Sequence, residues 1–293
     1  MQRRHACVVA ITAAVMVVVS GVALAADAPT FAGEPSRAPL AVAECRSVGP
    51  YRVPEPGSAG DPAGLRLCPS GPMIVNVPGA VVDGWNVRGG IVVDAPGVTI
   101  RRTRITGDGS RAYGIHTTAA GSVRVEDTTL TGDFLEAAVD GERWSGDRVA
   151  IIGVSHDGAR LGSGSRLRNS IVRDVAAAPG VAADAVVLRV GAGPVLLEDN
   201  MIDYGDADDG GDAVLLVPDA PGRRGRGSVV VRGNTLGGGR WVLRQDPASE
   251  DRADILVTGN RFRRDGDRDP VRVSPGTVLT DNGYDDRGLL PVR

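Results

Sequence analysis

The chain of 293 residues contains no lysine. Every cationic role, including that of a catalytic base, therefore falls to arginine or histidine. The 33 basic residues are outnumbered by 36 acidic ones, which gives a formal net charge of −3. This balance argues against nucleic acid, or an acidic membrane surface, as the main partner.

Aromatic side chains are also scarce, at 3% of the chain, whereas glycine is abundant, with 41 residues. Short stacked strands joined by tight turns suit this composition better than a helical bundle or an aromatic-rich sandwich. No segment shows a sustained hydrophobic period of 3.6 residues, so long helices are not expected. The composition favours an all-β fold.

Only the N-terminus carries a long apolar run. It has a basic start, the apolar run and a small-residue sequence, ALA, that ends at residue 25. This layout predicts that residues 1–25 are a secretory signal peptide, with an uncleaved membrane anchor as the alternative. Loss of Arg3 and Arg4 leaves 31 basic against 36 acidic residues, a net charge of −5. We expect a secreted, extracellular protein with no stable membrane association after cleavage.

Cysteine is nearly absent, with three residues. Removal of the leader removes Cys7 and leaves Cys45 and Cys68, which we expect to form a disulfide in an oxidising compartment. Such a bridge would close a short loop and stabilise the fold by about 3 kcal/mol. Two cysteines alone cannot fill a tetrahedral metal shell. We assign the bridge to residues 26–75, a Pro- and Gly-rich segment expected to cap one end of the fold.

A repeat runs through the rest of the chain, and its clearest copies read PVLLEDNMIDYG, VVVRGNTLGGG and ILVTGNRFRRD. Each copy has two aliphatic residues two positions apart, a short polar bend, and a closing hydrophobe. The closing position recurs at Val87, Ile105, Leu130, His156, Val172, Ile202, Leu236, Phe262 and Tyr284. Intervals of 16 to 34 residues are too short and uneven for a helix in every unit.

Each copy therefore predicts a strand, a bend and a second strand. A third strand follows the variable loop and begins at Gly90, Gly114, Asp157, Asp184, Asp212 and Asp269. Four asparagines stand two residues before the closing hydrophobe, where we expect them to adopt the left-handed bend and to bond along the stack. They are Asn200, Asn234, Asn260 and Asn282. These features predict that residues 76–293 form a single-domain right-handed parallel β-helix of about nine coils, with three short strands per coil.

Four runs carry a resemblance to a known family: IVNVPGAVVDGWNVRGGIVVDAPGVTIRRTRITG, HDGARLGSGSRLRNSIVRD, VVVRGNTLGGGRWVLRQD and LTDNGYDDRG. They resemble the secreted right-handed β-helix repeat proteins common in actinobacteria, relatives of the pectate lyase superfamily, over roughly residues 45–290. The resemblance implies the fold. It implies no single reaction, because the superfamily includes lyases, hydrolases, epimerases and proteins with no known activity.

Substrates in this superfamily usually lie along the outer face of the third strand. Alternation along that strand predicts which side chains point outward and which point inward. The outward column is predicted to contain His116, Arg160, Val187, Arg189, Leu215 and Arg272, and the inward column Ile115, Ala159, Val186, Leu216 and Val271.

Three aspartates precede this strand at one register, 27 and 28 residues apart: Asp157, Asp184 and Asp212. Stacked coils would place their carboxylates about 5 Å apart. At that distance each carboxylate would raise the pKa of its neighbour, or the carboxylates would share a calcium ion. The alternative is that each one caps backbone amides at the corner.

A second acidic group, Asp206, Asp208 and Asp209, lies in the loop before Asp212. Oxygen ligands on an acidic loop are what Ca²⁺ requires, so Ca²⁺ is the one cofactor that we expect, with a merely solvated loop as the alternative.

The chain departs from the superfamily at one position. Relatives often show a His-x-Asp-Gly stretch at the start of this strand, but here Ala182 and Ala185 flank Asp184. The stretch HDGAR, residues 156–160, keeps the Asp-Gly and a cation. The site is therefore either shifted to that coil or vestigial.

Two functions are consistent with these patterns. The first is an enzyme that acts on an extracellular acidic polysaccharide, most simply as a lyase, with hydrolase and epimerase chemistry as alternatives. Its candidate catalytic residues are His116, Asp157, Arg160, Asp184 and Asp212. In the absence of lysine, His116 or Arg160 would be the base. The second function is a catalytically inactive glycan-binding or cell-surface structural protein. We expect a monomer in either case.

Overall fold

The structure is a computed structural model that describes residues 58–177, 180–191, 193–205, 210–219, 227–250, 252–264 and 270–285. The predicted signal peptide and Cys45 lie outside these residues, so the Cys45–Cys68 pairing stays a prediction. Within the described residues there is no α-helix, and the named strands pair in parallel. Nor does this part of the chain contain a helix with the length and hydrophobicity that a membrane crossing needs.

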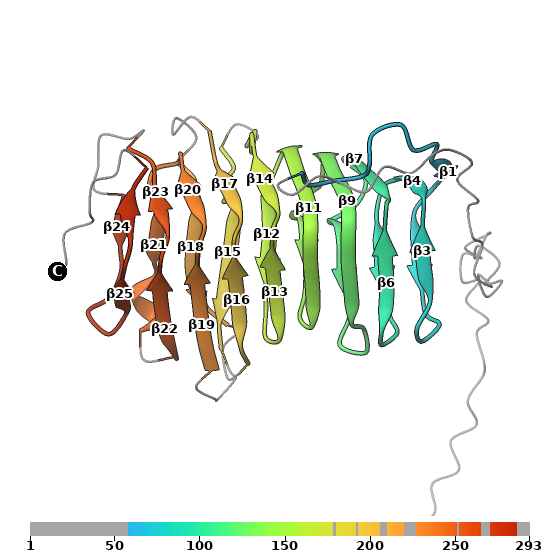
Figure 1. Cartoon of the computed structure of the whole chain (residues 1–293). Helices are drawn as coiled ribbons and strands as arrows, with labels where there is room; N and C mark the ends of the chain where they lie inside the picture. The colour runs from blue at the N-terminus through green and yellow to red at the C-terminus, as the bar shows by residue number, and fades with distance from the viewer. Residues whose placement is uncertain are drawn as a thin grey trace, which may run out of the picture. The chain divides into compact units, whose positions relative to one another are not determined.

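The strands stack side by side along one direction (Figure 1), and they form three ladders. The first ladder contains β3 (Val81–Asp83), β6 (Val98–Arg101), the first halves of β9 (Val123–Asp133) and β11 (Trp144–Val154), β13 (Ser165–Arg168), β16 (Val195–Glu198), β19 (Gly227–Arg232), β22 (Ala253–Thr258) and β25 (Val278–Thr280).

The second ladder contains β1 (Cys68–Ser70), β4 (Trp85–Arg88), β7 (Arg104–Asp108), the second halves of β9 and β11, β14 (Ile171–Arg173), β17 (Met201–Asp203), β20 (Thr235–Gly237), β23 (Arg261–Phe262) and β26 (Gly283–Tyr284). Because β9 and β11 run through the corner without a break, these two ladders join into one 17-stranded sheet.

The third ladder is a separate nine-stranded sheet. It contains β2 (Met73–Val75), β5 (Ile91–Val93), β8 (Tyr113–Thr117), β10 (Ala137–Asp140), β12 (Asp157–Leu161), β15 (Val186–Val190), β18 (Val214–Pro218), β21 (Leu243–Gln245) and β24 (Val271–Arg272). A single 3₁₀ turn, η2 (Pro247–Ser249), follows β21. The fold is therefore an all-β parallel β-helix, as predicted. The hand and the exact number of coils stay predictions.

The ladders begin with β1 and β2, inside the segment that we expected to form a cap. Cys68 opens β1, and its register partner on β4 is Trp85. The parallel ladders therefore start before residue 76.

Side chains at the closing position of the repeat fill the core. The register in the second ladder runs from Val87 to Ile105 and Leu130, and later from Val172 to Ile202, Leu236 and Phe262, all of them buried. Burial of each such side chain contributes about 1.5 to 3 kcal/mol. The predicted register is correct at these positions.

One position of the predicted register is wrong. Ile151, not His156, pairs with Leu130 and Val172. The reason is that β11 continues through the corner for 11 residues, and it places Val149 and Ile151 in the core. His156 lies beyond this strand, where its Nδ1 is 3.2 Å from the Ser155 hydroxyl.

The four asparagines form a buried ladder. The Nδ2 groups of Asn200, Asn234 and Asn260 each donate to Oδ1 of the next asparagine, ending at Asn282, at 2.9 Å in every step. Their backbone N–H groups donate to the same oxygens. We predicted that the asparagine itself adopts the left-handed conformation, and this is wrong. The residue before it does so, such as Asp199, with a φ of 52°.

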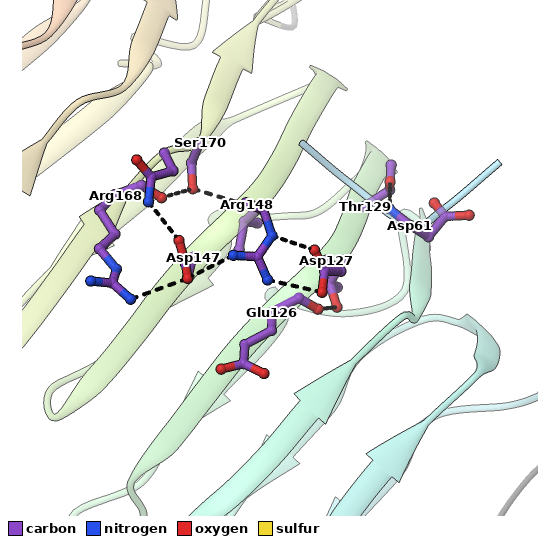
Figure 2. Close-up of polar contacts among 11 residues, drawn as sticks. Asp61, Glu126, Asp127, Thr129, Asp147, Arg148, Arg168 and Ser170 are labelled. Carbon is purple, nitrogen blue, oxygen red and sulfur yellow. Dashed lines mark hydrogen bonds and ion pairs between the residues drawn. The ribbon is translucent and has the colours of Figure 1, made fainter. Parts of the chain in front are cut away.

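The corner inside β9 and β11 carries an ion network, and the first described residues cross it (Figure 2). Arg148 bonds Asp127 through two nitrogens, at 2.6 and 3.1 Å, and Asp147 at 2.9 Å. Gly60 donates its N–H to the carbonyl oxygen of Arg148, and Asp61 donates its N–H to Oγ1 of Thr129. We call residues 58–67 the strap.

Candidate functional site

The three predicted aspartates stack at the corner that leads into the third ladder. The backbone N–H of Asp184 donates to Oδ1 of Asp157 at 2.8 Å, and the N–H of Asp212 donates to Oδ1 of Asp184, also at 2.8 Å. The column therefore exists, and at least two of its carboxylates cap the backbone of the following coil. This is one of the roles that the sequence left open.

The two ends of the column carry arginines. Nε of Arg160 donates to Oδ2 of Asp157 at 2.7 Å, and Nε of Arg244 donates to Oδ2 of Asp212. Asp184, between them, has no arginine partner among the residues that the structure describes. Burial, together with the charges of Asp157 and Asp212, raises the pKa of Asp184 to about 7. Burial also raises the pKa of Asp212, against the opposing effect of Arg244.

Arg160 is poorly suited to the base role that we expected for it. It also donates to Oε2 of Glu136 at 2.9 Å and to the Glu136 carbonyl oxygen. Burial favours loss of its proton, but Asp157 and Glu136 outweigh that effect and raise the pKa of Arg160. A general base must be unprotonated before it can accept a proton. Because its pKa is raised, Arg160 stays a cation and does not meet this requirement.

His116 is held by a carboxylate that the sequence did not reveal. Its Nδ1 lies 3.1 Å from Oδ2 of Asp140, its neighbour in the register of β8 and β10. The Asp140 side chain is only 5% exposed, whereas that of His116 is 32% exposed. A carboxylate only accepts, so the hydrogen lies on Nδ1, and Nε2 of the neutral ring is the basic nitrogen.

A second cation completes this pair. Nη2 of Arg189 donates to Oδ1 of Asp140 at 2.6 Å. Burial alone would raise the pKa of Asp140, but the contacts with His116 and Arg189 lower it below its ordinary value. Asp140 is therefore an anion that orients the imidazole, in the way that buried carboxylates orient catalytic histidines.

The ring of Tyr113 stacks on His116, with centroids 4.7 Å apart and an angle of 17° between planes. Burial and the negative charges of Asp140 and Glu136 raise the pKa of the Tyr113 phenol. At neutral pH the phenol therefore keeps its proton, which is the state that a hydrogen donor requires.

The third ladder brings most of these groups to one outer face. Its register joins Asp140 to His116 on one side, and Val139 to Ala159 on the other. Asp140 therefore stands between His116 and Arg160 in the outward column, with neighbouring coils about 4.8 Å apart. We call His116, Asp140, Arg160 and Arg189, with Tyr113, the histidine site.

The other predicted members of the outward column, Val187, Leu215 and Arg272, lie outside the histidine site. Val187 and Leu215 are buried, with 6% and 9% exposure, so they do not form the exposed apolar face that a scaffold protein would offer. Arg272 is exposed and lies over the ring of Trp241, 5.6 Å from its centroid. The position next to Leu215 is occupied by Arg244, which the sequence did not indicate.

The predicted calcium ligands Asp206, Asp208 and Asp209 lie outside the described residues, so calcium binding stays a prediction. In the described part of the chain, no group of three or more His, Cys, Asp or Glu side chains is arranged to hold a metal ion.

No protein-family model matches this chain, and neither a curated protein nor a solved structure matches it. The geometry of the sites is therefore the evidence for function. A partly exposed imidazole with an oriented tautomer, held by a carboxylate that also binds Arg189 and lies next to the coil of Arg160, is suited to proton abstraction next to a carboxylate.

Proposed function

We propose that the chain is a secreted β-helix protein that acts on an extracellular acidic polysaccharide as a lyase-like enzyme. The observation that carries this proposal is the hydrogen bond between Nδ1 of His116 and the buried carboxylate of Asp140. It leaves Nε2 free to accept a proton on the outer face of the third ladder.

In the proposed reaction, Nε2 of His116 removes the proton from C5 of a uronate unit. The electron pair of that C–H bond forms the C4–C5 double bond, and the bond from C4 to the glycosidic oxygen breaks. A proton donor then supplies the hydrogen to the leaving oxygen. Tyr113 is our candidate donor, because its phenol is protonated at neutral pH and its ring lies against His116.

The two arginines supply the charge that this reaction needs. Removal of the C5 proton builds negative charge on the uronate carboxylate, and a fixed cation stabilises it. The side chains of Arg160 and Arg189 each bind a carboxylate. They are also 20% and 30% exposed, so both still reach the surface. Bound Ca²⁺ would add positive charge, and its contribution is part of the test.

The alternative is a catalytically inactive glycan-binding or cell-surface structural protein. It is favoured by Ala182, which is exposed at the position where relatives often have a histidine. The charge compensation of Arg160 and Arg189 by carboxylates also suits a purely structural surface.

The test is detection, by ultraviolet absorbance, of unsaturated uronates released from pectic, alginate and glycosaminoglycan polymers. Each polymer is tested with added Ca²⁺ and with a chelator, using wild type and Arg189→Ala. Product from one polymer, reduced in the variant, is expected. Absence of product from every polymer, together with measurable binding, would instead establish the glycan-binding alternative.

Secretion and the monomeric state are part of the same proposal. The proposal of secretion rests on the sequence of residues 1–25. Cleavage of the leader and the Cys45–Cys68 disulfide are tested together by mass spectrometry of the exported protein, before and after reduction.

A further inference from the structure

A second polar groove lies on the first ladder, on a different sheet from the histidine site. Its volume is about 460 Å³, and its lining comes from β6, β9, β11 and the turns before them. Three arginines line it, Arg101, Arg124 and Arg143, with Glu126 as the one carboxylate among its lining residues. The groove therefore carries net positive charge.

One row of side chains runs along the stack through this groove and, at Arg166, extends one coil beyond its lining residues. Thr99 pairs with Arg124, Arg124 with Ser145, and Ser145 with Arg166, each one coil further along. Because coils are about 4.8 Å apart, the two arginines stand about 10 Å from each other, with a hydroxyl side chain between them. We call these four residues the arginine row.

The arginines of this row have guanidinium groups that are exposed and weakly paired, whereas neighbouring arginines form close ion pairs. Arg168 and Arg148 share Asp147 in the adjacent corner (Figure 2). The Arg124 side chain is 62% exposed, and its ion pair with Glu126 is long, at 3.6 Å.

Arg143, which lines the groove, and Arg166, the second arginine of the row, show the same contrast. Nε of Arg143 donates to the carbonyl oxygen of Gly121, which fixes the wall of the groove. Arg166 is exposed and has no side-chain partner among the described residues.

We infer that the arginine row is a second binding site, for the carboxylate or sulfate groups of a linear anionic saccharide that lies along the stack. Guanidinium groups bind both anions with directional hydrogen bonds, and the hydroxyls of Thr99 and Ser145 suit the hydroxyls of a sugar. A polymer repeats its anionic group, as the row repeats its cation, so each further contact is made at high effective concentration. The polymer class rests on the proposed function, but the site is separate from the histidine site.

Binding is measured by calorimetric titration at low salt, with polygalacturonate as the carboxylate probe and dextran sulfate as the sulfate probe. All proteins carry His116→Ala, so that no cleavage occurs during the titration. The double variant Arg124→Ala/Arg166→Ala is compared with Arg252→Ala/Arg261→Ala. The control pair is also exposed and removes the same charge elsewhere.

The row variant is expected to bind at least one probe roughly fivefold more weakly, and the control is expected to bind as the parent does. The probe that shows the loss identifies the anion. Equal losses in both double variants, or no loss in the row variant, would overturn the inference. The uronate assay is separate: a chain that yields no product, yet loses binding only in the row variant, refutes the lyase proposal and leaves this site standing.

Discussion

Nδ1 of His116 lies 3.1 Å from Oδ2 of Asp140, and Asp140 also accepts a hydrogen bond from Arg189 at 2.6 Å. The carboxylate is thus fixed from both sides and is nearly buried, whereas the imidazole reaches the surface. In the proposed mechanism Asp140 sets the tautomer of the imidazole, and His116 accepts the proton.

Asp140→Asn tests this positioning role. An asparagine can turn its amide N–H₂ toward Nδ1, which would move the ring hydrogen to Nε2 and block proton acceptance. At neutral pH we expect turnover to fall by a factor of about 10² to 10⁴, with little change in the free energy of unfolding. Ring ¹⁵N chemical shifts report which nitrogen carries the hydrogen.

The matched control for that variant is Asp94→Asn. Asp94 is exposed one coil before His116 and accepts a bond from Thr118 Oγ1, not from the histidine. It should leave turnover and the ring tautomer unchanged. If both variants lost activity equally, or if Asp140→Asn kept the Nδ1–H tautomer and full turnover, the positioning role would be wrong.

The aspartate column makes stability depend on pH. Folded Asp184 keeps its proton up to a pKa of about 7, whereas the unfolded chain releases it near pH 4. Between these values the folded state binds more protons, so stability falls as pH rises. Urea unfolding should show a loss of about 1 to 3 kcal/mol between pH 5 and pH 8, and Asp184→Asn should reduce this loss to the part that Asp212, whose pKa is also raised, contributes.

The asparagine substitution is suitable because its side-chain oxygen can still accept the N–H of Asp212. Asp94→Asn again serves as the control, and it should keep the slope of the parent. An unchanged slope in Asp184→Asn would show that Asp184 is ionised throughout this pH range.

The asparagine ladder should be a large contributor to stability. Asn234 is completely buried, and its Nδ2 donates to the Leu197 carbonyl oxygen and to Asn260. Asn234→Ala leaves these partners unsatisfied, so we expect a loss of about 2 to 4 kcal/mol in the free energy of unfolding. Asn86→Ala, at an exposed strand position, should cost less than about 0.5 kcal/mol. Similar losses in the two variants would show that the buried asparagine ladder does not contribute more to stability than an exposed strand position.

Gly60 should control docking of the strap. Its φ is +98°, and a Cβ there would lie 2.6 Å from Oγ1 of Thr129. Gly64 also has a positive φ, of +83°, but a Cβ there would meet open space. Gly60→Ala should therefore cost about 1 to 2 kcal/mol more than Gly64→Ala, and it should speed tryptic cleavage after Arg66. Equal stability and equal cleavage of the two variants would mean that the strap contact contributes nothing.

Most of the fold could be predicted because the hydrophobic residues that recur in the repeat are the ones that stack on one another in the core. Ile202, Leu236 and Phe262 occupy one register in the sequence and one column in the core. The prediction failed where a strand continues through its corner: β11 has no Asn or Gly in the position of the bend, so the break was placed too late, at His156.

The candidate site was only partly predictable. Asp157, Asp184 and Asp212 recur at one register, and a sequence can show recurrence. Asp140 does not recur: it stands at the end of β10, whereas Asp157, Asp184 and Asp212 stand at or just before the start of their strands. Counting 24 residues from His116 would have indicated it, but that interval is known only from the register of the structure.

The most direct test of the central claim is chemical rescue of His116→Ala with imidazole, measured as the rate of unsaturated uronate formation. The account predicts a loss of about 10² to 10⁴ that added imidazole partly restores, and no rescue of Arg160→Ala. A His116→Ala protein that releases unsaturated uronates at the rate of the wild type would contradict the account.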